Sequence, residues 1–329
     1  MERKLQELSN VIRQSAGFIS SLKAEISRVI VGQEHMIDSA IIAMLTGGHI
    51  LLEGVPGLAK TLLCNTLARV VDCQFKRIQF TPDLLPADLI GSLAYRQDDG
   101  TFYAKKGPIF ANLILADEIN RAPAKVQSAL LEAMQEKQVT IGDSTYPLPR
   151  PFLVIATQNP IDQEGTYALP EAQIDRFMMK VVVDYPTIAE ERRILERMTN
   201  PQTIVPNTIA SVSNIITAAS NVAQVYIDER VQNYIVELVY ATRHPEEYEL
   251  PKVKTCIARG ASPRATIALA TAAKAAAFMQ MRAFVSPDDI QKLVVDVLQH
   301  RIALTYEAEA DNITPPDIIE AIVEKVKSP

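Results

Sequence analysis

The sequence predicts an α/β domain with a parallel sheet, followed by a domain made of helices. Short apolar runs alternate with helical periodicity as far as about residue 186, a pattern typical of a parallel sheet packed by helices. A glycine-containing turn at residues 54–61 joins one apolar run to a helix. After Tyr185-Pro186-Thr187 no strand is evident. We therefore expect a boundary there, with domains at residues 1–186 and 187–329.

Length and composition agree with this division. A chain of 329 residues exceeds the size of one typical core, and 48% hydrophobic with 22% charged residues describes an ordinary globular protein. No apolar run is long enough to span a membrane, and we expect no signal peptide. Three scattered cysteines favour reduced thiols and a cytoplasmic location. A net charge of −6 argues against a protein that coats nucleic acid, and four dispersed histidines argue against a zinc or Ser-His-Asp enzyme.

Apolar spacing predicts the elements in order. Apolar residues that recur about every 3.6 positions predict helices. Apolar residues at every second position, or short continuous apolar runs, predict strands. Turns at Gln97-Asp98-Asp99-Gly100 and Gly142-Asp143 predict two hairpins, spanning residues 93–104 and 138–148. In the first domain we expect two helices within 1–28, helices at 34–45, 62–71, 124–135 and 169–177, and strands at 49–53, 74–80, 112–118, 152–157 and 178–183. In the second we expect helices at 188–198, 209–224, 228–242, 263–282 and 287–300.

Residues 54–61, Gly-Val-Pro-Gly-Leu-Ala-Lys-Thr, have the order of a phosphate-binding P-loop. Backbone N–H groups and the helix dipole favour an anion there. Lys60 can place a positive charge on phosphates, and the Thr61 hydroxyl can bind Mg²⁺. Ala59 stands where the general motif has glycine, so we expect it to keep a negative φ. A plain turn between strand and helix is the alternative.

Polar residues follow two other predicted strands. Asp117 and Glu118 end the run at 112–118, where Asp117 could hold Mg²⁺ and Glu118 could accept a proton from an attacking water. Asn159 follows the strand at 152–157, at the sheet edge where α/β folds bind ligands. It could position a water or touch a phosphate, or it could serve only the turn before Pro160. Solvated acids at a strand end are the alternative for Asp117 and Glu118.

With these motifs in order, the chain resembles the AAA+ ATPases and, among them, the MoxR family. The matching segments are Walker A (54–61), Walker B (113–118), sensor 1 (156–160), an arginine-finger segment (171–177) and the start of a sensor-2 helix (260–265). The hairpins match inserts of that family, and Ala59 is itself typical of its Walker A. The resemblance covers roughly residues 25–305.

The resemblance implies a P-loop AAA+ module with sheet order 5-1-4-3-2 and an all-helical lid domain, with ATP between them. It implies that Arg264 reaches the γ-phosphate in cis and that Arg176 reaches the nucleotide of a neighbouring subunit. It also implies that Val31, Gly32 and Gln33 cover the adenine side, where core packing is the alternative. Arg121 is a further candidate for a contact between subunits or for ordinary surface pairing. The expected nucleotide-binding residues are Val31, Gly32, Gln33, Gly54, Pro56, Gly57, Leu58, Ala59, Lys60, Thr61 and Leu62.

The implied function is Mg²⁺-dependent ATP hydrolysis that drives chaperone-like remodelling or assembly of partner proteins. The implied partners are a homo-oligomeric ring, commonly a hexamer, and client proteins that include von Willebrand A-domain proteins. One alternative is a nucleotide-gated scaffold that does not hydrolyse ATP, which Glu118 argues against. The other is a nucleic-acid motor or loader. The acidic tip of the first hairpin argues against it, whereas Lys105 and Lys106 keep it open.

Overall fold

The computed structural model describes residues 2–98, 100–159, 166–199 and 204–329. The chain forms two compact units. The sheet unit contains residues 18–176 and 181–216, and the helical unit contains residues 1–17, 177–180 and 217–329. We keep the domain boundary at residues 186/187 as a proposal. Asp99 of the first hairpin turn and Pro160 of the sensor-1 segment lie outside the described residues.

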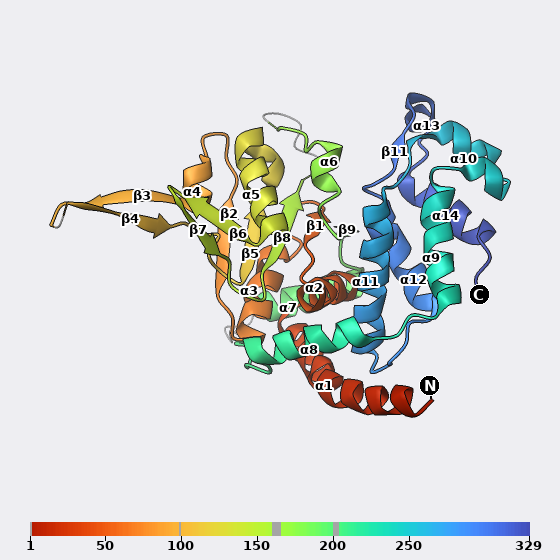
Figure 1. The fold of residues 1–329 in the computed structure, drawn as a ribbon, viewed down its shortest axis with the longest axis horizontal. Helices are drawn as coiled ribbons and strands as arrows, with labels where there is room; N and C mark the ends of the chain where they lie inside the picture. Colours follow the sequence, from red (N-terminus) through yellow and green to blue (C-terminus); the bar gives the residue numbers. More distant parts are fainter. Residues whose placement is uncertain (1, 99, 160–165, 200–203) are drawn as a thin grey trace. The chain divides into compact units, whose positions relative to one another are not determined.

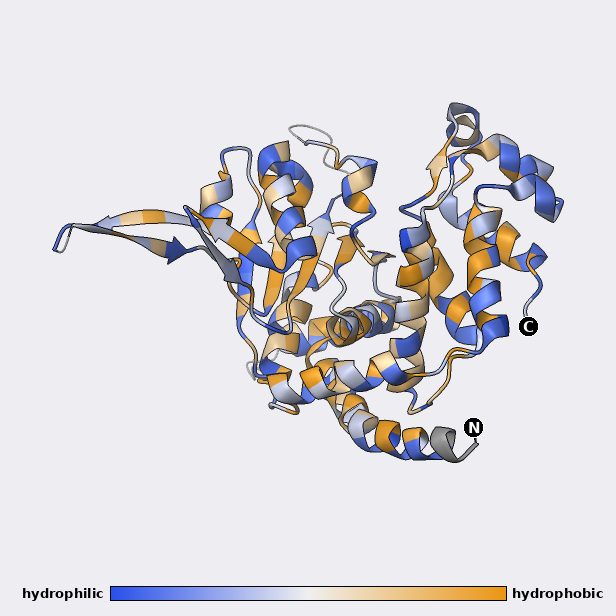
Figure 2. Cartoon of the chain, viewed as in Figure 1, coloured by the Kyte–Doolittle hydropathy of each residue, from blue (hydrophilic) through white to orange (hydrophobic). Residues whose placement is uncertain are grey.

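A five-stranded sheet has the order β2-β5-β8-β1-β9, and Figures 1 and 2 show its hydrophobic strands among helices. Numbered as five core strands along the chain, this is the predicted order 5-1-4-3-2. Strand β1 pairs with β8, β8 with β5 and β5 with β2, in each case parallel. The strands are β1 (Ile50–Glu53), β2 (Phe75–Gln79), β5 (Leu113–Asp117), β8 (Leu153–Gln158) and β9 (Met179–Val182).

Helices pack on this sheet because their apolar residues repeat at helical spacing. Helix α2 contacts β1 and β8, and α3 contacts β2 and β5. The residues that β5 and β8 contribute to the centre of the sheet are almost fully buried, as continuous apolar runs predict. The helices of the sheet unit include α2 (Glu34–Thr46), α3 (Lys60–Val70), α4 (Pro86–Ile90), α5 (Ala124–Glu136), α6 (Glu171–Ile174) and α7 (Ile188–Thr199).

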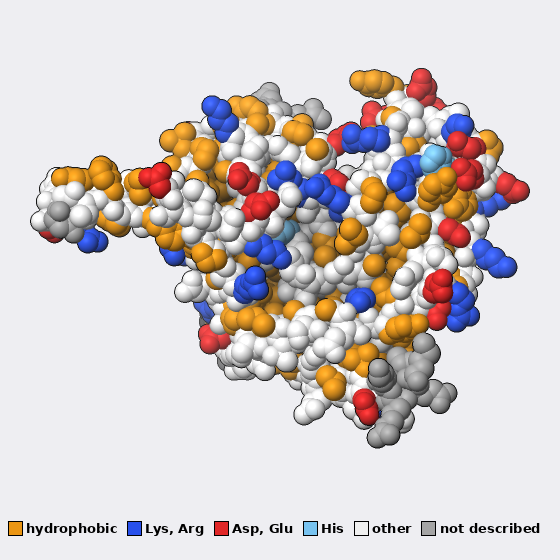
Figure 3. All heavy atoms as spheres, in the orientation of Figure 1, with side chains coloured by type: hydrophobic (Ala, Val, Ile, Leu, Met, Phe, Trp, Pro, Cys, Tyr) orange, Lys and Arg blue, Asp and Glu red, His pale blue; other side chains and the backbone are white. Residues whose placement is uncertain are grey.

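Both predicted hairpins form. The first pairs β3 (Gly91–Arg96) with β4 (Thr101–Lys106) and projects from the sheet unit (Figure 1). The second pairs β6 (Gln138–Ile141) with β7 (Ser144–Pro147). The register of the first hairpin puts Leu93, Tyr95 and Phe102 on one face, and Arg96 lies over the Tyr103 ring on the other. Phe102 is 69% exposed, and Figure 3 shows hydrophobic side chains along the projection.

The N-terminal region forms one helix, α1 (Glu2–Val29), so our expectation of two helices was wrong. Its apolar face is continuous. Ile12, Ala16, Ile19, Leu22 and Ile26 are all buried at spacings of three or four residues. Gly17 interrupts neither this face nor the helix.

The helical unit contains the expected helices and a small strand pair that the sequence pattern did not reveal. Strands β10 (Ile257–Arg259) and β11 (Ala303–Leu304) pair antiparallel. They are too short for a periodic signal. The helices from residue 212 onward are α8 (Val212–Gln224), α9 (Glu229–Ala241), α10 (Pro251–Cys256), α11 (Pro263–Met279), α12 (Pro287–Leu298), α13 (Tyr306–Ala310) and α14 (Pro315–Lys325). Within the described residues, no helix is both long and apolar enough to cross a membrane.

His49 joins three elements of the sheet unit from a buried position just before β1. Its Nδ1 accepts a hydrogen bond from the Val154 N–H at 3.0 Å, so Nε2 carries the proton and donates to Met134 O at 3.1 Å. Burial lowers the pKa of His49 to about 4. The imidazole is therefore neutral in the fold, with both nitrogens satisfied.

This burial predicts acid sensitivity. Because the folded-state pKa lies below the ordinary value of 6.5, the unfolded chain binds the extra proton as the pH falls from 6.5 to 4. The His49 contribution to stability is present above pH 6.5 and is lost through that window. We expect a loss of up to about 3 kcal/mol from this group, measured by urea unfolding at each pH.

His49→Gln should be less stable at pH 7 but should lose less stability between pH 6.5 and 4. Some slope should remain because the pKa of buried His300 is also lowered. His35→Gln, which removes an exposed histidine, is the matched control. Equal slopes in wild type and His49→Gln would contradict this role.

Candidate functional site

A cavity of 550 Å³ in the sheet unit collects most of the predicted site residues. Its walls come from the turn at 29–31, the loop at 54–62, the ends of β5 and β8, Arg77 of β2, and helix α7. The P-loop and the acids after β5 therefore face the same space. The predicted residues that line it are Val31, Gly54, Pro56, Gly57, Leu58, Ala59, Lys60, Thr61, Leu62, Asp117, Glu118 and Asn159.

The loop between β1 and α3 has a backbone that glycine makes possible. The Gly54 N–H donates to Gln158 O at 3.3 Å, and a Cβ at Gly54 would lie 2.7 Å from Val183 O. Gly57 has a φ of 90°, which side chains disfavour. The loop therefore lies close against its neighbouring strands and enters α3 directly.

Lys60, the first residue of α3, folds back over this loop. Its Nζ donates to Gly54 O. Partial burial lowers the pKa of Lys60, and the negative charges of Asp117, Glu53 and Glu118 oppose this shift. The ammonium group thus stands where an anion inside the loop would meet it.

Ala59 has a φ of 59° and a ψ of 16°, so our expectation of a negative φ was wrong. The turn into α3 needs a left-handed residue at this position, which explains the glycine of the general motif. Alanine accepts this conformation at a cost of about 1 kcal/mol. The buried apolar face of α3, which includes Leu63 and Leu67, holds the helix in place against that strain.

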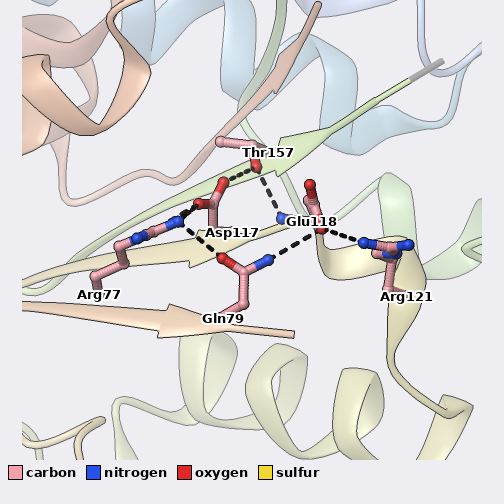
Figure 4. A network of polar contacts seen from close by, with 6 residues as sticks. All are labelled: Arg77, Gln79, Asp117, Glu118, Arg121 and Thr157. Atoms are coloured by element: carbon pink, nitrogen blue, oxygen red, sulfur yellow. Dashed lines mark hydrogen bonds and ion pairs between the residues drawn. The ribbon is translucent and has the colours of Figure 1, made fainter. Parts of the chain in front are cut away.

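Asp117, the last residue of β5, joins its two neighbouring strands (Figure 4). Its Oδ2 forms an ion pair with the Arg77 guanidinium of β2 at 2.6 Å. Its Oδ1 accepts a hydrogen bond from Thr157 Oγ1 of β8, also at 2.6 Å. The carboxylate is only 17% exposed. Its position is therefore set from both sides.

Glu118 follows in a left-handed conformation, with a φ of 56°. Its N–H donates to Thr157 Oγ1 at 2.9 Å. Its Oε2 accepts hydrogen bonds from Gln79 Nε2 and Arg121, each at 3.0 Å (Figure 4). Strained residues of this kind gather at functional sites. In this structure Arg121 thus pairs with Glu118 within the same chain.

Sequence reasoning missed several contributors. Arg77 and Gln79 were expected only as part of a strand, and Thr157 was expected within the sensor-1 segment but without a role of its own. A signal was present, because residues 77 and 79 share one face of a strand and the expected order places that strand beside the Walker B strand. The register confirms this, with Gln79 opposite Asp117. The other lining residues without a predicted role are Ile194, Arg197 and Met198. Val29 and Ile30 directly precede the predicted adenine-side residues, and Gln158 lies within the predicted sensor-1 segment.

Helix α7 and the turn at 29–31 form the apolar end of the cavity. Ile30 and Val31 are almost fully buried, and Ile194 and Met198 face the same space. Arg197 fixes α7 there by donating to Arg28 O at 2.9 Å. Gly32 and Gln33 continue the turn, and Gln33 Nε2 donates to Asp184 O at 2.9 Å.

The residues present fit a magnesium ion. Thr61 and Asp117 line one cavity and supply oxygen donors, which this hard cation prefers. The Arg77 guanidinium already places a positive charge on the Asp117 carboxylate. Among the described residues there is no group of three or more His, Cys, Asp or Glu side chains that could hold a metal ion.

Two predicted arginines lie elsewhere. Arg176, two residues after α6, lines a separate hollow of the sheet unit with Glu132, Glu136 and Gln173. Its Nε has no hydrogen-bond partner among the described atoms. Arg264 is an exposed residue at the start of α11 in the helical unit, where its N–H donates to the Ser262 side chain. The roles of both arginines stay predictions.

The strained Ala59 backbone yields a stability prediction. Ala59→Gly should raise the free energy of unfolding by up to about 1 kcal/mol, because glycine adopts the left-handed conformation without strain. Ala68→Gly, in the interior of the same helix, should lower it by about 1 kcal/mol or more. Urea unfolding measures both. A loss of stability in both variants would contradict our account of the loop.

Comparison with known proteins agrees with this site. The sequence matches the ATPase family associated with various cellular activities (AAA) over residues 49–179 and the AAA lid domain over residues 251–322. It is 49% identical to the Mycobacterium tuberculosis protein named Chaperone MoxR1, over 93% of this chain and 81% of that protein. It is 32% identical to the protein MoxR of Methylorubrum extorquens, over 93% of each chain. The crystal structure of a proposed ATPase from Cytophaga hutchinsonii is 52% identical, with a TM-score of 0.93 over 99% of both chains. The chain belongs to the MoxR family of AAA+ ATPases.

Proposed function

We propose that this protein is an Mg²⁺-dependent ATPase that uses hydrolysis to remodel or assemble partner proteins. One observation carries the proposal. A single cavity joins the P-loop to two acids at the end of β5, the Walker B strand, which β8 separates from β1 in the sheet. A P-loop alone would support nucleotide binding, whereas Glu118 adds a group that can accept a proton from water.

Each group of residues around the cavity would have its own role. The N–H groups of the loop and of the first turn of α3 would bind the phosphates, and Lys60 would add charge to them. The apolar surfaces of Val31, Ile194 and Met198 would receive the purine base. Thr61 and Asp117 would hold Mg²⁺, which would neutralise phosphate charge when bound. Glu118 would act as general base, and Asn159 would orient the attacking water or contact the terminal phosphate.

In the structure one carboxylate oxygen of Glu118 already has two hydrogen-bond donors. Its Oε2 accepts from Gln79 and from Arg121. Glu118 would therefore either accept the proton of the attacking water on Oε1 or give up one of these two hydrogen bonds.

The proposed assembly is a homo-oligomeric ring, with a hexamer as the expected form. Arg176 lies in a hollow apart from the cavity of its own sheet unit, which supports a role at a neighbour's nucleotide. A guanidinium supplied from another subunit can accelerate phosphoryl transfer by about 10³-fold or more. We propose that Arg264 acts within its own chain.

The proposed clients are proteins, among them von Willebrand A-domain proteins. The name of the M. tuberculosis relative, Chaperone MoxR1, supports a chaperone-like role. The exposed aromatic residues of the first hairpin, Tyr95 and Phe102, offer apolar contact area for a client. Arg96 and Tyr103 cover the opposite face of the hairpin, and they would set the orientation of that contact.

Binding and hydrolysis can be tested separately. Lys60→Ala should weaken the binding of a fluorescent ATP analogue by about tenfold or more, because it removes charge-assisted hydrogen bonds. Lys76→Ala, which removes an exposed lysine of β2, is the matched control. Glu118→Gln should keep the affinity but reduce steady-state phosphate release by about 10²-fold.

Each result has a contrary outcome. Unchanged binding by Lys60→Ala would contradict the P-loop assignment. Equal and near-zero phosphate release by wild type and Glu118→Gln, with intact ATP binding, would favour the non-hydrolysing scaffold instead.

The role of Arg176 can be tested by mixing subunits. Arg176→Ala should bind ATP normally but hydrolyse it poorly, because the charge that it supplies acts only on the transition state. Mixing it with Glu118→Gln subunits should restore phosphate release, since each subunit supplies what the other lacks. Absence of restored activity in assembled mixtures would count against action between subunits.

A further inference from the structure

Three consecutive side chains after α12 hold the backbone that directly follows Arg176. Gln299 Nε2 donates to Lys180 O at 2.7 Å, and His300 Nε2 lies 3.1 Å from Phe177 O. Arg301 donates to Phe177 O at 2.6 Å and to Met178 O at 3.1 Å. We call Gln299, His300 and Arg301, with the carbonyls that they bind, the carbonyl clamp.

The clamp side chains are buried or half-buried, and each is hydrogen-bonded to a backbone carbonyl. Gln299 is 8% exposed and Arg301 is 7% exposed. A buried guanidinium needs several acceptors, and Arg301 also donates to Val297 O of α12. Because Phe177 O is an acceptor, His300 carries its proton on Nε2, and burial with the Arg301 charge keeps its pKa well below the ordinary value. These bonds place residues 177–180 within the helical unit, although β9 begins at Met179.

Part of this arrangement follows from the position of β9 at the edge of the sheet, where unpaired backbone groups need hydrogen-bond partners. Strand β9 lies at the end of the sheet order, so some of its backbone groups lack a neighbouring strand. Yet three clamp bonds reach Phe177 and Met178, which precede the strand. Edge protection alone does not require donors at these two residues.

Arg176 is the residue immediately before the clamped segment. Its own N–H donates to Gln173 O at 3.2 Å, so the backbone is held on both sides of its Cα. Its Nε is buried and has no partner among the described atoms. The direction in which this side chain leaves the backbone therefore depends on the clamp.

We infer that Gln299, His300 and Arg301 position Arg176 for its action on the nucleotide of a neighbouring subunit. This inference rests on the proposed role of Arg176. The three are positioning residues, since they touch backbone carbonyls. A displacement of the guanidinium by about 1 Å can cost about 10²-fold in rate. Loss of the clamp should therefore impair a subunit as a supplier of Arg176, without impairing it as a site of hydrolysis.

The mixed-subunit assay separates these two roles. In it, Glu118→Gln subunits supply Arg176, and Arg176→Ala subunits supply the hydrolytic site. Arg301→Met added to the Glu118→Gln subunits should reduce the restored phosphate release by about tenfold or more. The same substitution added to the Arg176→Ala subunits should leave it unchanged, because those subunits have no arginine to position.

Controls address folding and assembly. Arg282→Gln breaks the partly buried ion pair with Asp289, which lies in the same helical unit and involves none of residues 177–180. In the Glu118→Gln subunits it should leave the restored activity unchanged. If Arg301→Met fails to fold, Gln299→Met removes a single clamp bond and should cause a smaller loss with the same asymmetry. Thermal unfolding and size-exclusion chromatography check each subunit before mixing.

The outcomes are distinguishable. Loss only when Arg301→Met is in the Glu118→Gln subunits supports the inference. Equal loss in both positions, or no loss in either, would overturn it while leaving the role of Arg176 intact. If the unmodified pair restores no activity, the proposed role of Arg176 fails, and the inference fails with it.

Discussion

The Asp117 carboxylate links the three strands on which the candidate site is built. It accepts the Thr157 hydroxyl from β8 and the Arg77 guanidinium from β2, while its own backbone ends β5. Thr157 also accepts the N–H of Glu118. Loss of this carboxylate would remove the ion-pair partner of Arg77 and the acceptor of the Thr157 hydroxyl beside the P-loop. Asp117 and Thr157 thus set the positions of the proposed metal ligand and of the proposed general base, Glu118.

Two residues of the site have a strained backbone. Ala59 and Glu118 both adopt left-handed conformations that residues with side chains disfavour, and both line the cavity. Each is held by regular structure, Ala59 by α3 and Glu118 by the bonds around Thr157. The strain places Lys60 over the loop and directs Glu118 toward Gln79 and Arg121. A relaxed backbone at either residue would change which groups face the phosphates.

Local sequence patterns predicted both hairpins and most of the cavity residues, whereas the sheet order was predicted only through the resemblance to the family. Apolar runs mark β5 and β8, and the P-loop motif contains its own geometry. Sequence reasoning failed where contacts between distant segments determine the backbone conformation or the lining of the cavity. The positive φ of Ala59 follows from how the loop enters α3, and the single helix α1 follows from a buried face that continues past Gly17. Ile194 and Met198 were expected only as part of a helix, because nothing local shows that α7 lines the cavity. The carbonyl clamp joins residues about 120 apart in the chain.

We propose that Asp117 joins Mg²⁺ to the P-loop site. The most direct measurement is the Mg²⁺ concentration that gives half-maximal phosphate release at saturating ATP, compared between wild type and Asp117→Asn, with Arg77→Met as a control for loss of the ion pair alone. We expect Asp117→Asn to need a much higher Mg²⁺ concentration and Arg77→Met to need no more than wild type, since Arg77 competes for the same carboxylate. The same half-maximal concentration in wild type and Asp117→Asn would contradict the account.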